Sequence, residues 1–97
     1  MTCKVTADWY VKDGKREELI EIMRGALPQT RKWDGCIQLD LSINQDNPPH
    51  LVMTEEWGIS QHHKDYFQAR VDEGMAAALM EFLEQPPKFT YCDLTDV

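Results

Sequence analysis

The side chains best suited to chemistry gather in one short stretch, between Trp57 and Arg70. Within it, His62 and Tyr66 are four residues apart, so on a helix they would be neighbours on one face. A neutral histidine with an ordinary pKa of about 6.5 could take the proton of a substrate hydroxyl that a phenol holds in place. This spacing predicts His62 and Tyr66 as the catalytic residues.

Four further side chains are candidates for binding a substrate. Trp57 could stack on a planar molecule, and Arg70 could neutralise an enolate or a carboxylate. His63 precedes Phe67 by four residues and should therefore lean inward with it. Each also has a structural alternative, because buried aromatic side chains, solvated histidines and surface ion pairs are common.

Two acidic residues and one thiol outside this stretch are further candidates for chemistry. Glu55 and Glu56 are adjacent in a strand-like segment, so they point to opposite faces. One of them must face the helices or another sheet, where a carboxyl group needs a partner. Cys36 has no spaced histidine to activate it, which favours a packed thiol over a nucleophile.

Several kinds of site are not expected. The sequence has no HExxH motif and no glycine-rich phosphate loop, so we expect no metal and no cofactor. The cysteines are Cys3, Cys36 and Cys92, without a CxxC pair or a secretory leader before them. This pattern is typical of free thiols in a cytoplasmic protein.

The length and net charge of the chain indicate one domain and argue against nucleic acids and membranes as partners. Ninety-seven residues suffice for one domain, spanning residues 1–97, and the net charge is −7. Such an acidic chain is a poor ligand for nucleic acids or anionic membrane surfaces, because both attract clustered Lys and Arg. No apolar run approaches the roughly 20 residues of a membrane span, so we expect no membrane association.

The hydrophobic periodicity predicts four strands and three helical segments. Period-two alternation indicates strands at 3–11, 36–43, 51–57 and 88–94, and helical spacing indicates helices at 15–32, 60–73 and 75–83. Asp13 or Gly14 could cap the first helix, and Pro28 should kink it or end it near Leu27. Ser60 should cap the second helix.

This order predicts an α+β fold of the ferredoxin-like split βαβ type, βαββαβ. Its sheet would be four-stranded and antiparallel, with the helices on one face. The other face stays uncovered, and we expect Trp9, Trp57, Tyr91 and aliphatic residues to be spread over both faces. An exposed apolar face of that size favours a homodimer.

Several motifs resemble a known family. Val11–Lys15 precedes a helix, Gly35-Cys36 opens a strand, and Glu55-Glu56-Trp57 ends another shortly before Ser60. This combination resembles the antibiotic biosynthesis monooxygenase domain of the dimeric α/β-barrel superfamily. The resemblance implies two sheets packed face to face and a ligand cavity between the helices and the sheet.

The resemblance also implies chemistry. Some relatives oxidise aromatic compounds with oxygen and without metal or flavin, because the substrate anion is itself the reductant. Haem-degrading relatives use a strand-one Asn and a helix His, and here Asp8 and Tyr66 stand at the comparable positions. We therefore expect a cofactor-independent monooxygenase acting on a small phenolic, quinol-like or enolisable compound. The alternatives are an isomerase of a small metabolite, or a non-catalytic dimer that binds a small molecule or is structural.

Overall fold

The computed structural model describes residues 2–97, which form four strands and three helices. Along the chain these are β1 (Cys3–Tyr10), α1 (Arg16–Arg31), β2 (Cys36–Ile43), β3 (His50–Trp57), α2 (Ser60–Asp72), α3 (Met75–Met80) and β4 (Lys88–Asp93). The expected βαββαβ order is confirmed, with α2 and α3 together forming the second helical part. None of the helices within residues 2–97 has the length and apolar character needed to cross a membrane.

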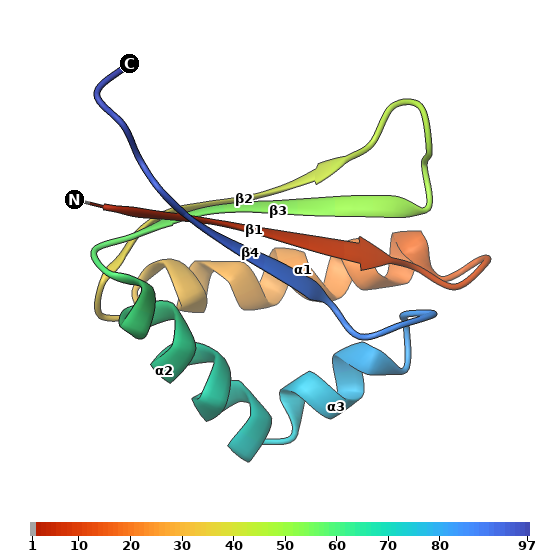
Figure 1. Ribbon diagram of the computed structural model, residues 1–97. Helices are drawn as coiled ribbons and strands as arrows, with labels where there is room; N and C mark the ends of the chain where they lie inside the picture. The colour runs from red at the N-terminus through yellow and green to blue at the C-terminus, as the bar shows by residue number, and fades with distance from the viewer. Residues whose placement is uncertain (1) are drawn as a thin grey trace.

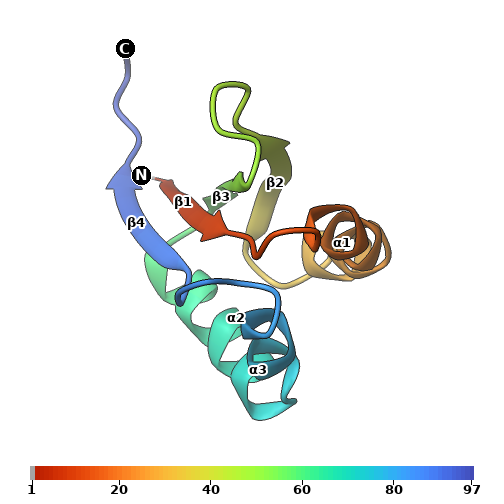
Figure 2. The ribbon, with the colours of Figure 1, turned by 90° about the vertical axis from the view of Figure 1, so that its right-hand side faces the viewer.

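The strands form one antiparallel sheet in the order β2-β3-β1-β4. All three helices lie against the same face of this sheet (Figure 1). On this face α1 lies next to β2, whereas α2 and α3 lie farther along the sheet, away from α1 (Figure 2). The space between them is where side chains from the helices and the sheet meet.

The helix ends differ from the sequence predictions. Lys15 and Ile59 are the residues that precede α1 and α2, and neither helix has a side-chain cap, so neither Asp13, Gly14 nor Ser60 caps a helix. Helix α1 also continues past Pro28 to Arg31.

Contacts with other elements account for the differences at the ends of α1 and α3. Thr30, in the last turn of α1, is buried, and its hydroxyl lies 2.9 Å from the Tyr66 hydroxyl, which holds that turn against α2. Helix α3 ends at Met80 rather than at Leu83, because Leu83 leaves the helix to form a β-bridge with Val11.

The strand register gives the two faces of the sheet different characters. Directly opposed residues of antiparallel strands share a face. Val5 is opposite both Glu55 and Tyr91, and Trp9 and Trp57 have the same parity as Val5 and Glu55. Trp9, Trp57 and Tyr91 are therefore all on the helix-covered face, and the prediction that they spread over both faces is wrong. The uncovered face is mostly polar and carries Lys4, Thr6, Asp8, Tyr10, Gln38, Asp40, Ser42, His50, Val52, Thr54, Glu56, Lys88, Thr90 and Cys92.

The same register places Cys3 and Cys92 on opposite faces of the sheet. Cys3 is opposite Asp93 and buried under the helices, whereas Cys92 is opposite Lys4 and exposed on the uncovered face. All three thiols are free, as expected from the sequence. Burial also raises the pKa of the Cys3 thiol, which lowers its thiolate fraction.

This arrangement makes a testable prediction about thiol reactivity. Under non-reducing conditions a thiol-specific dye should label Cys92 quickly in the folded protein and Cys3 only slowly, because the dye needs an accessible thiolate. In denaturant all three thiols should react. Recovery of a single thiol in the unfolded, unreduced protein would mean that a disulfide exists.

Candidate functional site

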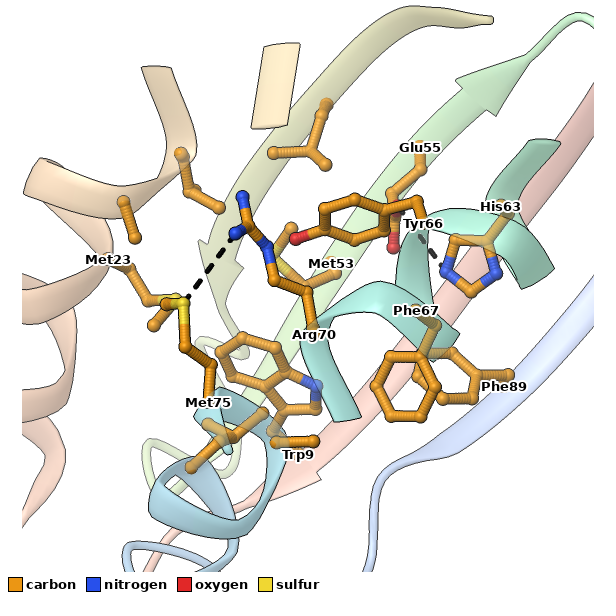
Figure 3. A pocket seen from close by; sticks show the side chains of 15 residues that line it. Trp9, Met23, Met53, Glu55, His63, Tyr66, Phe67, Arg70, Met75 and Phe89 are labelled. Carbon is orange, nitrogen blue, oxygen red and sulfur yellow. Dashed lines mark hydrogen bonds and ion pairs between the residues drawn. The ribbon is translucent and has the colours of Figure 1, made fainter. Parts of the chain in front are cut away.

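The cavity lies between the sheet and the diverging helices. Its volume is about 80 Å³. It is lined mainly by aromatic and aliphatic side chains and thioethers, with only a few groups that can carry charge (Figure 3). The lining comes from all three helices and all four strands: Trp9, Met23, Ala26, Leu27, Leu39, Met53, Glu55, His63, Tyr66, Phe67, Arg70, Met75, Ala76, Leu79 and Phe89.

Glu55 is the acidic group of this cavity. It is 4% exposed, and across the sheet it lies between Val5 and Leu39, both buried. Its carboxylate accepts one hydrogen bond, from Trp57 Nε1 at 3.0 Å. Burial raises the pKa of Glu55 from 4.5 to about 7, although the Trp57 hydrogen bond acts in the opposite direction. A carboxyl group in this state can accept or donate a proton near neutral pH.

His63 lies beside Glu55 and is fully buried. Its Nδ1 is 2.9 Å from the Tyr91 hydroxyl, and its Nε2 is 3.7 Å from Glu55 Oε1. Burial lowers the pKa of His63 to about 4, so the imidazole is neutral at neutral pH. The contact with Glu55 is then neither an ion pair nor, at this length, a hydrogen bond. His63 therefore closes the cavity beside Glu55 with a neutral ring.

Tyr66 and Arg70 form the wall that faces α1. The Arg70 guanidinium lies 5.1 Å from the centre of the Tyr66 ring and 5.5 Å from that of Trp33, which are cation–π distances. Its Nη1 is 2.9 Å from Glu73 and 3.6 Å from the sulfur of Met75. Figure 3 shows the Tyr66 ring between the Arg70 guanidinium and the Glu55 carboxyl. The cavity thus has a cation and a weakly acidic carboxyl at different places on its wall.

The expected His62–Tyr66 pair is not formed. His62 packs against Gly35 and Gly58 and is not part of the cavity lining, and its Nδ1 is buried without a hydrogen-bond partner among the described residues. Adjacent residues of a helix point about 100° apart, so only one of the two histidines can face the cavity. In α2 that residue is His63.

Gly35 is required by this packing. Its φ is +88°, a conformation that favours glycine, and a Cβ there would lie 2.1 Å from His62 Nδ1. Gly35→Ala should therefore lower the free energy of unfolding by about 2 kcal/mol, through backbone strain and overpacking. Denaturant titration measures this loss. The double variant Gly35→Ala/His62→Ala should recover the part due to overpacking, and no recovery would contradict the steric explanation.

Of the other predicted binding residues, Phe67 lines the cavity and Trp57 does not. Phe67 lines the cavity and packs on Phe89, with ring centres 4.8 Å apart. Trp57 has no exposed surface and is not part of the lining; it lies behind Glu55 and donates its indole N–H to that carboxylate. Trp9 lines the cavity instead, and its Nε1 is buried without a partner among the described residues.

Glu55 is the acidic residue of the cavity, and it was not among the predicted site residues, although the sequence contains a signal for it. It shares the period-two phase of Leu51, Met53 and Trp57, all of which are buried. That phase places Glu55, and not Glu56, on the apolar face.

Residues 2–97 contain no cluster of three or more His, Cys, Asp or Glu side chains that could hold a metal ion.

A comparison with protein families gives this arrangement a context. The antibiotic biosynthesis monooxygenase profile matches residues 2–78, which is most of the chain. The chain belongs to this family. No curated protein sequence matches it.

Solved structures of this fold cover nearly the whole chain. A conserved protein from Methanosarcina mazei has a TM-score of 0.86 at 22% identity, with 98% of this chain and 94% of that one covered. Rv0793 from Mycobacterium tuberculosis has a TM-score of 0.84 at 22% identity, with 100% and 98% covered. A monooxygenase of Streptomyces coelicolor, in complex with the ligand nanaomycin D, has a TM-score of 0.78 at 18% identity, with 98% and 88% covered. At these identities the likeness concerns the fold.

Proposed function

We propose that this protein is a cofactor-independent monooxygenase that acts on a small phenolic, quinol-like or enolisable compound. The observation that carries the proposal is the Glu55 carboxyl, which is buried in an apolar cavity and has a pKa of about 7. Membership of the antibiotic biosynthesis monooxygenase family supports the oxygen chemistry.

The chemistry needs only the substrate, oxygen and a base. Glu55 takes a proton from the bound phenol or enol, and the resulting anion transfers electrons to oxygen and forms a carbon–oxygen bond. The peroxide takes back the proton from Glu55, its O–O bond breaks, and water leaves with the hydrogen that remains on that carbon. One oxygen atom ends in the new carbonyl group and the other in water, so no external reductant is consumed.

The other cavity residues have supporting roles in this proposal. Tyr66 and Phe67 hold the ring of the substrate, and Arg70, on a different part of the wall from Glu55, supplies a positive charge that favours an anionic substrate. His63 stays neutral and keeps water away from Glu55. Apolar surroundings favour the step, because they strengthen the electrostatic interactions inside the cavity.

A substrate screen tests the proposal. Purified protein is mixed with quinols, phenols and enolisable ketones, and dissolved oxygen is followed with an electrode at about pH 8, where Glu55 would be ionised. The expected result is oxygen uptake that depends on protein and on no added flavin, metal or reductant. Ligand binding without any oxygen uptake would contradict the proposal and favour a binding protein of the same fold.

We also propose that the protein is a homodimer formed through the uncovered face of the sheet. The uncovered face is not the apolar surface that the sequence predicted, so the proposal rests instead on the family resemblance, which implies two sheets packed face to face. The uncharged residues available for such packing are Val52 and a row of opposed threonines, Thr6, Thr54 and Thr90. Light scattering at micromolar concentration should give roughly twice the chain mass of 11.3 kDa. A mass that stays at one chain would contradict the dimer.

A further inference from the structure

We propose that the preferred ligands of the cavity are single-ring aromatic acids, with a carboxylate at one end for Arg70 and a hydroxyl at the other end for Glu55. This inference rests on the proposed function, because it names the substrate class of the same site. Three features of the cavity carry it: a cation, a buried carboxyl and a small volume.

The cation comes first. Arg70 lines the cavity with a side chain that is only 14% exposed, and its guanidinium lies within cation–π distance of two aromatic rings. A guanidinium has five N–H donors arranged as a fork that matches a carboxylate, and the contacts with Glu73 and Met75 are both made by Nη1. The Glu73 side chain is 48% exposed, so its ion pair is weakened by solvent. A carboxylate inside the cavity would meet the same cation with less competition from water.

The carboxyl group defines the other end. Glu55 accepts one hydrogen bond, from Trp57, and a carboxylate has room for more. A second anionic group next to Glu55 would be repelled, whereas a hydroxyl would donate a hydrogen bond to it. This asymmetry gives the ligand a direction, with its carboxylate toward Arg70 and its hydroxyl toward Glu55. The Tyr66 ring, seen between these two groups in Figure 3, provides a surface on which one aromatic ring can pack.

The volume limits the ring system. Cavities that hold drug-sized ligands measure roughly 300–1,000 Å³, and this cavity has about 80 Å³. A cavity of about 150 Å³ holds one benzene ring, so this cavity is too small for fused rings and can take a single ring once the flexible side chains of Met23 and Met75 move aside.

Isothermal titration calorimetry with matched ligands tests the inference on the whole protein. The probes are para-hydroxybenzoate, its neutral analogue para-hydroxybenzamide, benzoate, and a hydroxynaphthoate with two fused rings. In the unsubstituted protein para-hydroxybenzoate should bind about tenfold or more tightly than the amide, as expected for a charge-assisted pair. It should also bind more tightly than benzoate and than the hydroxynaphthoate.

Variants assign the preference to its residue. Arg70→Met should bring the ratio of acid to amide affinity close to one, and Arg70→Lys should restore it in part, because lysine lacks the planar fork. Glu73→Gln should tighten binding of the acid, because it removes the competing carboxylate. Arg24→Met is the matched control, since Arg24 is an exposed arginine of α1 whose partner is Glu21, and it should leave the ratio unchanged.

The outcomes separate this inference from the proposed function. Equal binding of acid and amide by the unsubstituted protein, or an unchanged ratio in Arg70→Met, would overturn the ligand class even if neutral quinols are oxidised. Arg70-dependent binding of the acid would support the ligand class even if no compound in the oxygen screen is consumed, which would overturn the monooxygenase proposal alone.

Discussion

Glu55→Gln should lower the rate of substrate oxidation by about 10²-fold or more at about pH 8, the usual effect of removing a general base. Glutamine has the size of glutamate and can still accept the Trp57 hydrogen bond, so the cavity should keep its shape. What it cannot do is take a proton. In the unsubstituted protein the rate should rise with pH through about 7, the pKa that burial gives Glu55, whereas this rise should be absent from Glu55→Gln.

The control for this experiment is Glu18→Gln. Glu18 is an exposed residue of the first turn of α1 and lies outside the cavity. Its substitution should leave the rate and the pH profile unchanged. A rate for Glu55→Gln within threefold of that of the control would remove Glu55 from the chemistry.

Glu55→Gln should also stabilise the folded protein at alkaline pH. In the folded protein Glu55 keeps its proton up to a pH of about 7, whereas at its ordinary pKa of 4.5 the unfolded chain loses that proton earlier. Ionisation in the buried site therefore lowers the free energy of unfolding progressively as pH rises from 4.5 to 7. At roughly 1.4 kcal/mol per pKa unit, the full effect is about 3 kcal/mol. Because glutamine does not ionise, the advantage of the variant should grow to this size by about pH 8.

Urea titrations at a series of pH values measure this difference. His63 acts in the opposite direction, because its lowered pKa of about 4 makes folding less favourable as pH falls below 6.5. In the unsubstituted protein the two effects oppose each other between 4.5 and 6.5. In Glu55→Gln the His63 effect remains alone, so its stability should fall more steeply toward acid pH. A constant difference between variant and unsubstituted protein across the pH range would contradict the raised pKa of Glu55.

The strands could be predicted because period-two alternation is a local property of the sequence, and their arrangement in one antiparallel sheet follows from the βαββαβ order along the chain. The same alternation contains the inward direction of Glu55, through its phase with Leu51, Met53 and Trp57. The alternation does not show whether the buried Glu55 side chain lies in the packed core or borders a cavity. A buried carboxyl becomes a site only when the helices leave space above it. That space depends on the divergence of α1 from α2 and α3, which no local pattern encodes.

The side chains of helix α2 that face the cavity were harder to predict from the sequence. The spacing of His63 to Phe67 favours His63 as the inward residue, but the apolar pattern of the helix is weak, so the sequence also allowed a pair of His62 with Tyr66. The structure resolves this through contacts between distant segments, with His62 against Gly35 and His63 against Tyr91. The pairing of Arg70 with Trp33 is likewise a contact between distant segments. Pro28 is a further case, because burial of Thr30 outweighs the local tendency of proline to end a helix.

The central claim is that Glu55 ionises near neutral pH inside the cavity, and carboxyl NMR tests it most directly. With glutamate labelled at the side-chain carboxyl carbon, the Glu55 signal is the one missing from the spectrum of Glu55→Gln. Its chemical shift, followed against pH in the folded protein, should change with a midpoint of about 7. A midpoint close to the ordinary value of 4.5 would show that Glu55 is already ionised in mildly acidic solution and would contradict the account.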